Sequence, residues 1–240
     1  MSATRLPKAI GFDLGETLVH YAGLPLNWQG LYGQALTRVA EACGHPITEA
    51  DITLGEAILG RYNTRQHPRL HEVTADRVLG EVLAAWGLPV VVGMDQAEDA
   101  FFGFFQQAFA VYPDTLPALQ ALQSRWVSVG VLTDAPYGMP RRFVERDLAP
   151  IATCLDVALT SVEVGHRKPH PSGYLALAER LGVAPFDMAY VGNEEKDIVG
   201  ANGAGMFSVL IDRTGGGAAF GQKRTITSLR KLAEWKELTD

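Results

Sequence analysis

Three polar residues come directly after short apolar runs of the chain: Asp13, Thr133 and Asn193. A carboxylate can attack an electrophile or bind a cation, a hydroxyl can donate a hydrogen bond to an anion, and an amide oxygen can bind a cation. Each residue also has a structural interpretation, since Asp13 could cap a helix and Thr133 could simply end a strand. Their chemistry therefore depends on whether the surrounding elements bring them together.

The apolar runs predict buried parallel strands at residues 8–12, 127–132, 189–192 and 208–212. Helical periodicity lies between and after them, at residues 115–126, 170–181 and 197–204. This alternation predicts an α/β fold with a doubly wound parallel sheet, in which ligands bind just beyond the carboxyl ends of the strands. An amphipathic helix over residues 225–238 is expected to close the chain.

One region breaks the alternation. Between Gly23 and Tyr112 no confident strand is predicted apart from an ambiguous run at residues 88–92, and helical periodicity dominates. The candidate helices are residues 28–43, 49–62, 74–86 and 95–110. We expect residues 1–21 and 113–240 to form the α/β core, and residues 22–112 to form an inserted helical cap.

Composition excludes several classes of protein. The 240 residues are 47% hydrophobic and 20% charged, and no run of 18 or more apolar residues could cross a membrane. The net charge of −6, without any long block of Lys and Arg, argues against nucleic acid as a partner. Only two cysteines are present and no signal-peptide pattern opens the chain. We expect a cytoplasmic monomer or homodimer acting on a small molecule.

Four segments resemble, in order, the motifs of the haloacid dehalogenase-like (HAD) superfamily. Residues 10–18 (IGFDLGETL) are similar to its first motif, a hydrophobic strand followed by Asp-x-Asp-x-Thr. Residues 129–134 (VGVLTD) resemble the second motif, residues 165–171 (GHRKPHP) the Lys-Pro-x-Pro motif, and residues 191–198 (VGNEEKDI) the acidic fourth motif. The four together are far more specific than any one. The helical insertion resembles a type 1 cap.

This resemblance implies a Mg²⁺-dependent hydrolase that works through an aspartyl-phosphate. Asp13 would be the nucleophile, while Thr133 and Lys168 would bind the substrate phosphate and Lys168 would keep Asp13 ionised. Asp13, the backbone carbonyl of Gly15, Asn193 and Asp197 would hold Mg²⁺. The cation and the lysine are needed because the anionic oxygens of a phosphoryl group repel a carboxylate nucleophile.

Two positions depart from the family pattern. Gly15 stands where most family phosphatases carry a second Asp as general acid and base, and losing such a group costs ~10²–10⁴-fold for leaving groups that need a proton. Glu16 is expected to point away from Asp13, because side chains alternate along extended backbone. Asn193 stands where an Asp is usual, which removes one negative charge from the metal site. The missing acid favours substrates with good leaving groups, such as acyl phosphates, and the lost charge is expected to weaken Mg²⁺ binding.

The predicted cap contains a basic segment, residues 61–71 (RYNTRQHPRLH), with three Arg, two His and no acid. Arg61 and Arg65 are candidates for binding an anionic group of the substrate, and an exposed turn between helices is an equally good interpretation. A phosphonatase would need a cap lysine for its Schiff base, and there is none between Val19 and Thr115. That activity is therefore nearly excluded.

Three functions stay open at this point. The favoured one is a phosphatase for a small phosphorylated metabolite. The second is a 2-haloacid dehalogenase, in which halide leaves without a proton, although those enzymes carry an aromatic residue at the position of Gly15. The third is a catalytically weak protein that binds a phosphorylated metabolite, against which the joint presence of Asp13, Thr133, Lys168 and Asp197 argues.

Overall fold

The structure is a computed structural model that describes residues 6–235 of the chain, except for the side chains of residues 91 and 92. Internal contacts divide the chain into two compact units. The first comprises Met1–His20, Ala110–Asp134 and Asp147–Asp240, and the second comprises Tyr21–Phe109 and Ala135–Arg146. The chain first passes from the first unit to the second within β2 (Val19–Tyr21), and it first returns within β3 (Phe109–Val111). These two strands pair with each other.

The first unit contains a six-stranded parallel sheet. In spatial order its strands are β5 (Val157–Thr160), β4 (Ser128–Thr133), β1 (Ala9–Phe12), β6 (Met188–Gly192), β7 (Phe207–Ile211) and β8 (Arg224–Ile226). β1, the first strand of the chain, lies between β4 and β6, so the strand order reverses direction beside it. Ligands bind at such a switch point in open α/β sheets.

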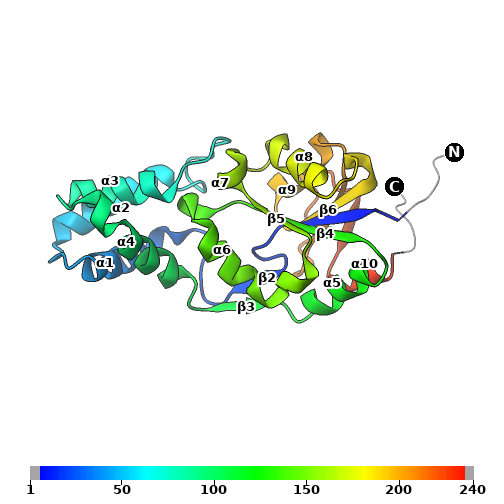
Figure 1. Cartoon of the computed structure of the whole chain (residues 1–240), viewed down its shortest axis with the longest axis horizontal. Coiled ribbons are helices and arrows are strands. Elements are labelled where there is room, and N and C mark those ends of the chain that lie inside the picture. The colour runs from blue at the N-terminus through cyan, green and yellow to red at the C-terminus, as the bar shows by residue number, and fades with distance from the viewer. Residues whose placement is uncertain (1–5, 236–240) are drawn as a thin grey trace. The chain divides into compact units, whose positions relative to one another are not determined.

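Helices cover both faces of this sheet (Figure 1). α8 (Pro171–Arg180) packs on β4 and β5, and α9 (Glu195–Gly203) packs on β6 and β7. On the other face, α5 (Thr115–Gln123) packs on β4, and α10 (Arg230–Ala233) packs on α5. Gly11 of β1 permits close packing on the α8 face, since a Cβ there would lie 2.8 Å from Leu177 of α8.

The second unit is built from four α-helices with three short connecting segments. They are α1 (Tyr32–Ala42), α2 (Glu49–Tyr62), α3 (Ala75–Ala85) and α4 (Val90–Phe105), preceded by the 3-10 helix η1 (Trp28–Leu31). α1 packs on α2 and α4, and α3 packs on the same two helices. Phe101, Phe102 and Phe105 of α4 are fully buried in this core. Residues 135–146 join the unit through the 3-10 helix η2 (Pro136–Gly138) and the start of α6 (Arg141–Leu148).

The α/β fold with a doubly wound parallel sheet is confirmed, and so are the four predicted core strands. The expected helix at residues 225–238 is largely wrong. Its first residues form β8, which pairs with β7 from Val209 to Ile211, and only Arg230–Ala233 is helical within the described part of this segment. Thr225 and Ile226 are β-branched and fit an extended strand better than a helix. Residues 236–238 of the prediction lie outside the described residues.

Three further differences concern short or marginal elements. The ambiguous run at residues 88–92 contains the start of a helix, because α4 begins at Val90 after Pro89 and ends at Phe105 rather than at residue 110. β3 follows, where no strand was expected. β5 was also missed, since it is short and half of it is only partly buried. The 3-10 helices η3 (Ala149–Cys154) and η4 (Pro185–Asp187) and the one-turn α7 (Ser161–Val164) complete the first unit.

Candidate active site

The predicted site residues of the first unit gather at the carboxyl edge of its sheet. Register pairs Phe12 with Val131 of β4 and with Val191 of β6, so Asp13 leaves β1 level with the ends of both neighbours. The backbone N–H of Asp13 continues the ladder by donating to Val191 (2.9 Å). Thr133 ends β4, and its hydroxyl forms no hydrogen bond with any residue from 6 to 235 although the residue is 7% exposed. It is therefore available to a ligand.

Lys168 lies at the centre of this edge, on the loop between α7 and α8. Its ammonium donates to Asp13 Oδ1 (2.5 Å) and to Asp197 Oδ1 (2.6 Å), and its side chain is 1% exposed. The same Nζ is also within hydrogen-bond distance of the Leu132 carbonyl oxygen (3.4 Å) and the Tyr190 hydroxyl oxygen (3.3 Å). The structure thus brings Asp13, Lys168 and Asp197 into one buried cluster, as the motifs predicted.

In this cluster, burial and ion pairing shift the pKa values of Asp13 and Lys168 in opposite directions. Burial raises the pKa of Asp13 to about 6, against the opposing pull of the Lys168 ammonium. Burial alone would lower the pKa of Lys168, but the Asp13 and Asp197 carboxylates outweigh it and hold that pKa well above its ordinary value. Lys168 is therefore a permanent cation, and Asp13 becomes a carboxylate as the pH rises through about 6.

Asp197 is fixed at the start of α9 and is fully buried. Its second oxygen, Oδ2, accepts the backbone N–H of Glu194 (3.0 Å) in a capping box, so both of its oxygens are engaged. Gly192 makes room for it, because a Cβ at that position would overlap the Asp197 carboxylate. Asp197 therefore serves first to orient Lys168, and could reach a cation only through water or by giving up one of these bonds.

Asp134 and Lys196 were not predicted as site residues, yet they form a second charged pair beside the first. Asp134 Oδ1 accepts the backbone N–H of Lys168 (3.0 Å), and its Oδ2 lies 3.0 Å from Lys196 Nζ and 3.6 Å from Arg167. Burial would raise the pKa of Asp134, but the cations Lys196, Arg167 and Lys168 lower it to about 2. Their positions next to Thr133 and Asp197 in sequence were the available signal.

The turn after the nucleophile has a different character. A Cβ built on Gly15 would meet nothing within 4 Å, and its φ is not in the left-handed region. Glu16 has a φ of 56°, and its carboxylate accepts a hydrogen bond from the hydroxyl of Tyr112, the residue directly after β3 (2.7 Å). Glu16 is therefore held by Tyr112 and not by Asp13. The buried Thr17 hydroxyl donates to Asn193 Oδ1 (3.3 Å), which links the first motif to the fourth.

Arg213, just beyond β7, holds this turn from outside. Its guanidinium donates to the Thr17 carbonyl (2.7 Å) and to Asp114 Oδ2 (3.0 Å), and it stacks over the Tyr112 ring at 3.7 Å. Asp114 is anchored in turn by Ser228 (2.7 Å) and by the Leu229 backbone N–H (2.8 Å). Arg213 thereby fixes the backbone next to Gly15. It was missed because nothing in its local sequence marks it.

A family model described as haloacid dehalogenase-like hydrolase matches residues 7–205, which include all four motifs and every residue of the buried cluster. The chain belongs to the haloacid dehalogenase-like hydrolase family. It is therefore a hydrolase by family, as the motif resemblance implied.

Relatives of this HAD-like hydrolase include phosphatases. Phosphatase MT3486 of Mycobacterium tuberculosis (strain CDC 1551 / Oshkosh) is 33% identical over 57% of the chain and 63% of its own length. The phosphoglycolate phosphatase of Escherichia coli (strain K12) is 32% identical over 46% of the chain and 44% of its own length. The chain thus spans less than two thirds of these two proteins. A glyceraldehyde 3-phosphate phosphatase of Methanopyrus kandleri is 36% identical over 86% of the chain and 84% of its length.

Solved structures agree on the fold. A 2-haloacid dehalogenase from Pseudomonas syringae has a TM-score of 0.69 at 24% identity, covering 95% of the chain and 97% of its own. A HAD phosphatase from Thermococcus onnurineus has a TM-score of 0.63 at 23% identity, covering 94% and 96%. Because both phosphatases and dehalogenases share this fold, the structural similarity does not distinguish the two activities.

None of the described helices is both long and apolar enough to cross a membrane.

The oxygen atoms near Asp13 suit a hard divalent cation, although they do not include a cluster of three acidic, His or Cys side chains among the described residues. Asp13 Oδ2 accepts no hydrogen bond from residues 6–235, and neither does the Gly15 carbonyl. Asn193 Oδ1 accepts only the long bond from Thr17 (3.3 Å). Carboxylate, carbonyl and amide oxygens are the ligand types that Mg²⁺ prefers, and Mg²⁺ usually keeps several waters beside them.

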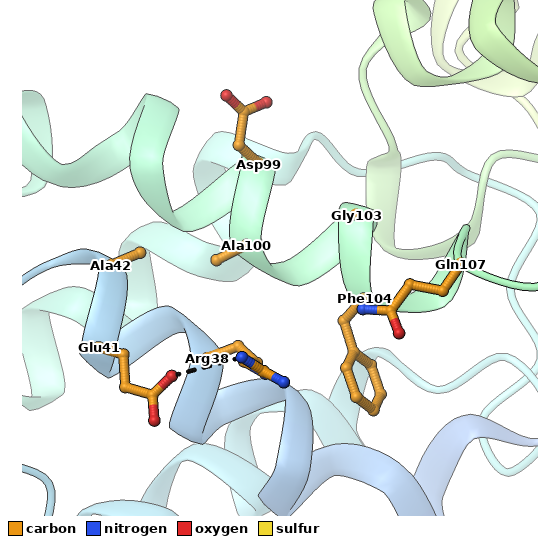
Figure 2. A pocket seen from close by; sticks show the side chains of 8 residues that line it. All are labelled: Arg38, Glu41, Ala42, Asp99, Ala100, Gly103, Phe104 and Gln107. Atoms are coloured by element: carbon orange, nitrogen blue, oxygen red, sulfur yellow. Dashed lines mark ion pairs between the residues drawn. The ribbon is translucent and has the colours of Figure 1, made fainter.

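The second unit holds the predicted substrate-binding arginines. Arg61 lies in the last turn of α2 and pairs with Glu81 of α3 (2.7 Å), with the Arg61 side chain exposed. The exposed Arg65 lies three residues beyond that helix. A depression of about 510 Å³ lies between α1 and α4, and these arginines do not line it. Figure 2 shows the side chains that do line it. Its charged residues Arg38, Glu41 and Asp99 are all exposed. Nothing in it resembles a reactive site.

Proposed function

We propose that this HAD-like hydrolase is a phosphatase that works through an aspartyl-phosphate on Asp13. The observation that carries the proposal is the buried Lys168 ammonium, held 2.5 Å from Asp13 and 2.6 Å from Asp197 at the switch point of the sheet. A fixed cation beside a carboxylate nucleophile is what attack on an anionic phosphoryl group requires. The phosphatases among its relatives support the same activity.

Each residue has a role that follows from its contacts. Asp13 Oδ1 is occupied by Lys168, which leaves Oδ2 to attack phosphorus. The free Thr133 hydroxyl donates to a phosphoryl oxygen, and Lys168 offsets charge on both nucleophile and substrate. Asp197 positions Lys168 through its 2.6 Å bond.

We further propose Mg²⁺ as the cofactor, held by Asp13 Oδ1, which has a second lone pair beside the bond from Lys168, the Gly15 carbonyl and Asn193 Oδ1, with Asp197 contributing through water; Asp13 Oδ2 remains the attacking atom. Bound there, it would offset the negative charge of the phosphoryl oxygens. Asn193 is neutral, so the site carries one negative charge less than a site with Asp at that position and should bind the cation more weakly.

The absence of a proton donor at Gly15 sets the substrate class. A leaving group with a low pKa departs without a proton, whereas an alkoxide does not, and general acid catalysis contributes ~10²–10⁴-fold where a proton is needed. We therefore propose that acyl phosphates and similarly activated phosphoesters are preferred. The substrate is a small metabolite, and the second unit, Tyr21–Phe109 with Ala135–Arg146, acts as the cap, with Arg61 and Arg65 as candidates for binding an anionic group.

One set of assays tests this function. The purified protein is given acetyl phosphate, an aryl phosphate and 2-chloropropionate, each with Mg²⁺ and with chelator. We expect Mg²⁺-dependent loss of acetyl phosphate, slower cleavage of the aryl phosphate and no halide release. Metal-independent release of chloride would instead identify a dehalogenase. Saturable phosphate binding without any chemical step would identify a binding protein.

A substitution at the nucleophile completes the test. Asp13→Asn keeps the shape of the side chain and removes its nucleophilic oxygen, so we expect no cleavage of any of the three substrates. Glu234→Gln, at an exposed position of the same unit, is the control and is expected to leave the rates unchanged. Persistent activity in the Asp13→Asn protein would show that another group attacks.

A further inference from the structure

The glycine at position 15 is not required by the backbone or by packing. A Cβ at Gly192 or at Gly11 would overlap neighbouring atoms, so those two positions need glycine on steric grounds. Gly15 has open space around its missing side chain and no positive φ. Within the described part of the first unit, no atom beyond its chain neighbours lies within 4 Å of a Cβ built at this position. The position beside the nucleophile is therefore vacant of any acid or base, and a side chain could be accommodated there.

The other carboxylates around Asp13 in its unit are already engaged. Asp197 accepts Lys168 at one oxygen and the Glu194 N–H at the other. Asp134 is held by Lys196, Arg167 and the backbone of Lys168. Glu16 accepts the Tyr112 hydroxyl. Asp197 and Asp134 would have to break a hydrogen bond or an ion pair at either oxygen before they could take a proton from water, and Glu16 is held through its Oε2 on Tyr112.

From this we infer that the phosphoryl group transferred to Asp13 is hydrolysed slowly, so that the protein accumulates as a phosphoenzyme. The inference rests on the proposed phosphatase function and concerns the relative rates of its two steps. The phosphoryl group would then stay on Asp13 for much longer than its transfer from the substrate takes, so the protein would carry an activated phosphoryl group.

The two steps make different demands on protons. In the first, a bond forms between Asp13 Oδ2 and phosphorus while the bond from phosphorus to the acyl oxygen breaks, and the acid leaves as a carboxylate. No proton moves. In the second, a bond forms between water and phosphorus while the bond to Oδ2 breaks, and Asp13 leaves as a carboxylate. The attacking water must give up one proton, which passes to solvent here while the other stays on the hydrogen phosphate that leaves, and a positioned base normally speeds that proton transfer ~10²–10⁴-fold.

Rapid-quench kinetics with acetyl phosphate and Mg²⁺ test this inference. We expect a burst of acetate equal to one per chain, followed by slow steady-state release of phosphate. The quenched protein should gain the mass of one phosphoryl group, and borohydride reduction should convert Asp13, and no other carboxylate, to homoserine. Fast release of phosphate over many turnovers with no phosphoenzyme would overturn the inference while leaving the phosphatase function intact. Absence of both acetate release and phosphoenzyme would overturn the phosphatase function itself, and the inference with it.

A pair of matched variants locates the cause at position 15. Gly15→Asp supplies a carboxylate in the open space, so we expect steady-state phosphate release to rise ~10²–10⁴-fold and the burst to vanish. Gly15→Asn has the same side-chain size without a base and is expected to bring no such gain. Equal gains in both variants, or none in Gly15→Asp with an intact circular dichroism spectrum, would refute the missing base as the cause. The wild-type burst is read independently of how either variant folds.

Discussion

Two regions flank the nucleophile of this HAD-like hydrolase, and they are built in opposite ways. On the side of Lys168, the carboxylates of Asp13, Asp197 and Asp134 are buried, and each is engaged by a cation. On the side of Gly15, the turn is fixed from outside by Arg213 and Tyr112, but the space next to the nucleophile is open.

This contrast separates charge stabilisation from proton transfer. The paired region offers fixed cations to an anionic group and keeps Asp13 in place, which would serve the proposed attack on phosphorus. The open region offers backbone oxygen to a cation but no group that gives or takes a proton. A site of this kind is suited to substrates whose leaving group carries its own charge. Under the proposed function, slow cleavage of other substrates would follow from one missing side chain and not from loss of the charged cluster.

Lys168→Met is expected to have the largest effect, because it removes the cation on which the paired region is built. Asp13 and Asp197 would then face each other without compensation, and breaking a buried pair in this way costs about 3–5 kcal/mol. We expect acetyl phosphate cleavage to fall on the order of 10³-fold. Urea unfolding and initial rates measure the two effects. Lys231→Ala, at an exposed ion pair, is the control; a Lys168→Met protein with near-normal rates would remove Lys168 from the mechanism.

Gly192→Ala and Gly15→Ala compare the two regions directly with the same added methyl group. At Gly192 the methyl overlaps Asp197, so we expect a loss of about 1–3 kcal/mol in unfolding free energy and roughly 10²-fold in kcat as Lys168 is displaced. At Gly15 the methyl enters open space, so we expect unfolding free energy within about 0.5 kcal/mol of wild type. Thermal melts compare the stability of the two variants, and initial rates compare their kcat. Similar destabilisation by both changes would contradict the contrast between a packed and an open side.

The sequence predicted the parts of the site that lie at strand ends. Asp13 and Thr133 directly follow or end apolar runs, and parallel strands align their carboxyl ends whatever the loops do. The core strands were predicted for the same reason, since a strand buried on both faces is a continuous apolar run. Lys168 and Asp197 needed the motif resemblance, because neither side chain's direction can be read from its own segment.

The parts that could not be predicted depend on tertiary contacts between distant residues. Arg213 contacts Thr17 across 196 positions of the chain, and Tyr112 contacts Glu16 across 96. No local pattern encodes such pairs. Asp134 and Lys196 were visible in the motifs but are 62 positions apart, so their pairing could only be seen in the fold. β8 was mistaken for helix because Leu229, Leu232 and Trp235 are buried at a helical spacing, although the segment before them is extended.

Arg213→Ala is expected to loosen the open region without touching the paired one. It removes the donor to the Thr17 carbonyl and leaves Asp114 without its guanidinium. Because the turn carries the Gly15 carbonyl and reaches Asn193 through Thr17, we expect weaker activation by Mg²⁺ and about a tenfold lower kcat, with little change in the substrate KM. Arg213→Lys should recover part of the loss, since an ammonium can still pair with Asp114.

The control for that experiment is Arg180→Ala, an exposed arginine of α8 in the same unit. Titration of activity with Mg²⁺ separates positioning from general destabilisation, since a merely less stable protein would keep the wild-type Mg²⁺ midpoint at temperatures where it is folded. An unchanged midpoint in Arg213→Ala would therefore show that Arg213 only supports the fold.

Asp134→Asn is expected to have the smallest effect, one that depends on pH. The folded-state pKa of Asp134 is about 2, below its ordinary value of 3.8, because the Lys196, Arg167 and Lys168 cations outweigh burial. A lowered pKa stabilises the fold above about pH 4, and this contribution is lost as the pH falls toward 2. The wild type should therefore exceed the variant by about 2 kcal/mol near pH 7. Urea unfolding at pH 7, 5 and 3 should show the gap narrowing toward the lowest pH. A gap that stays constant would mean that Asp134 acts through its neutral hydrogen bond to Lys168 and not through its charge.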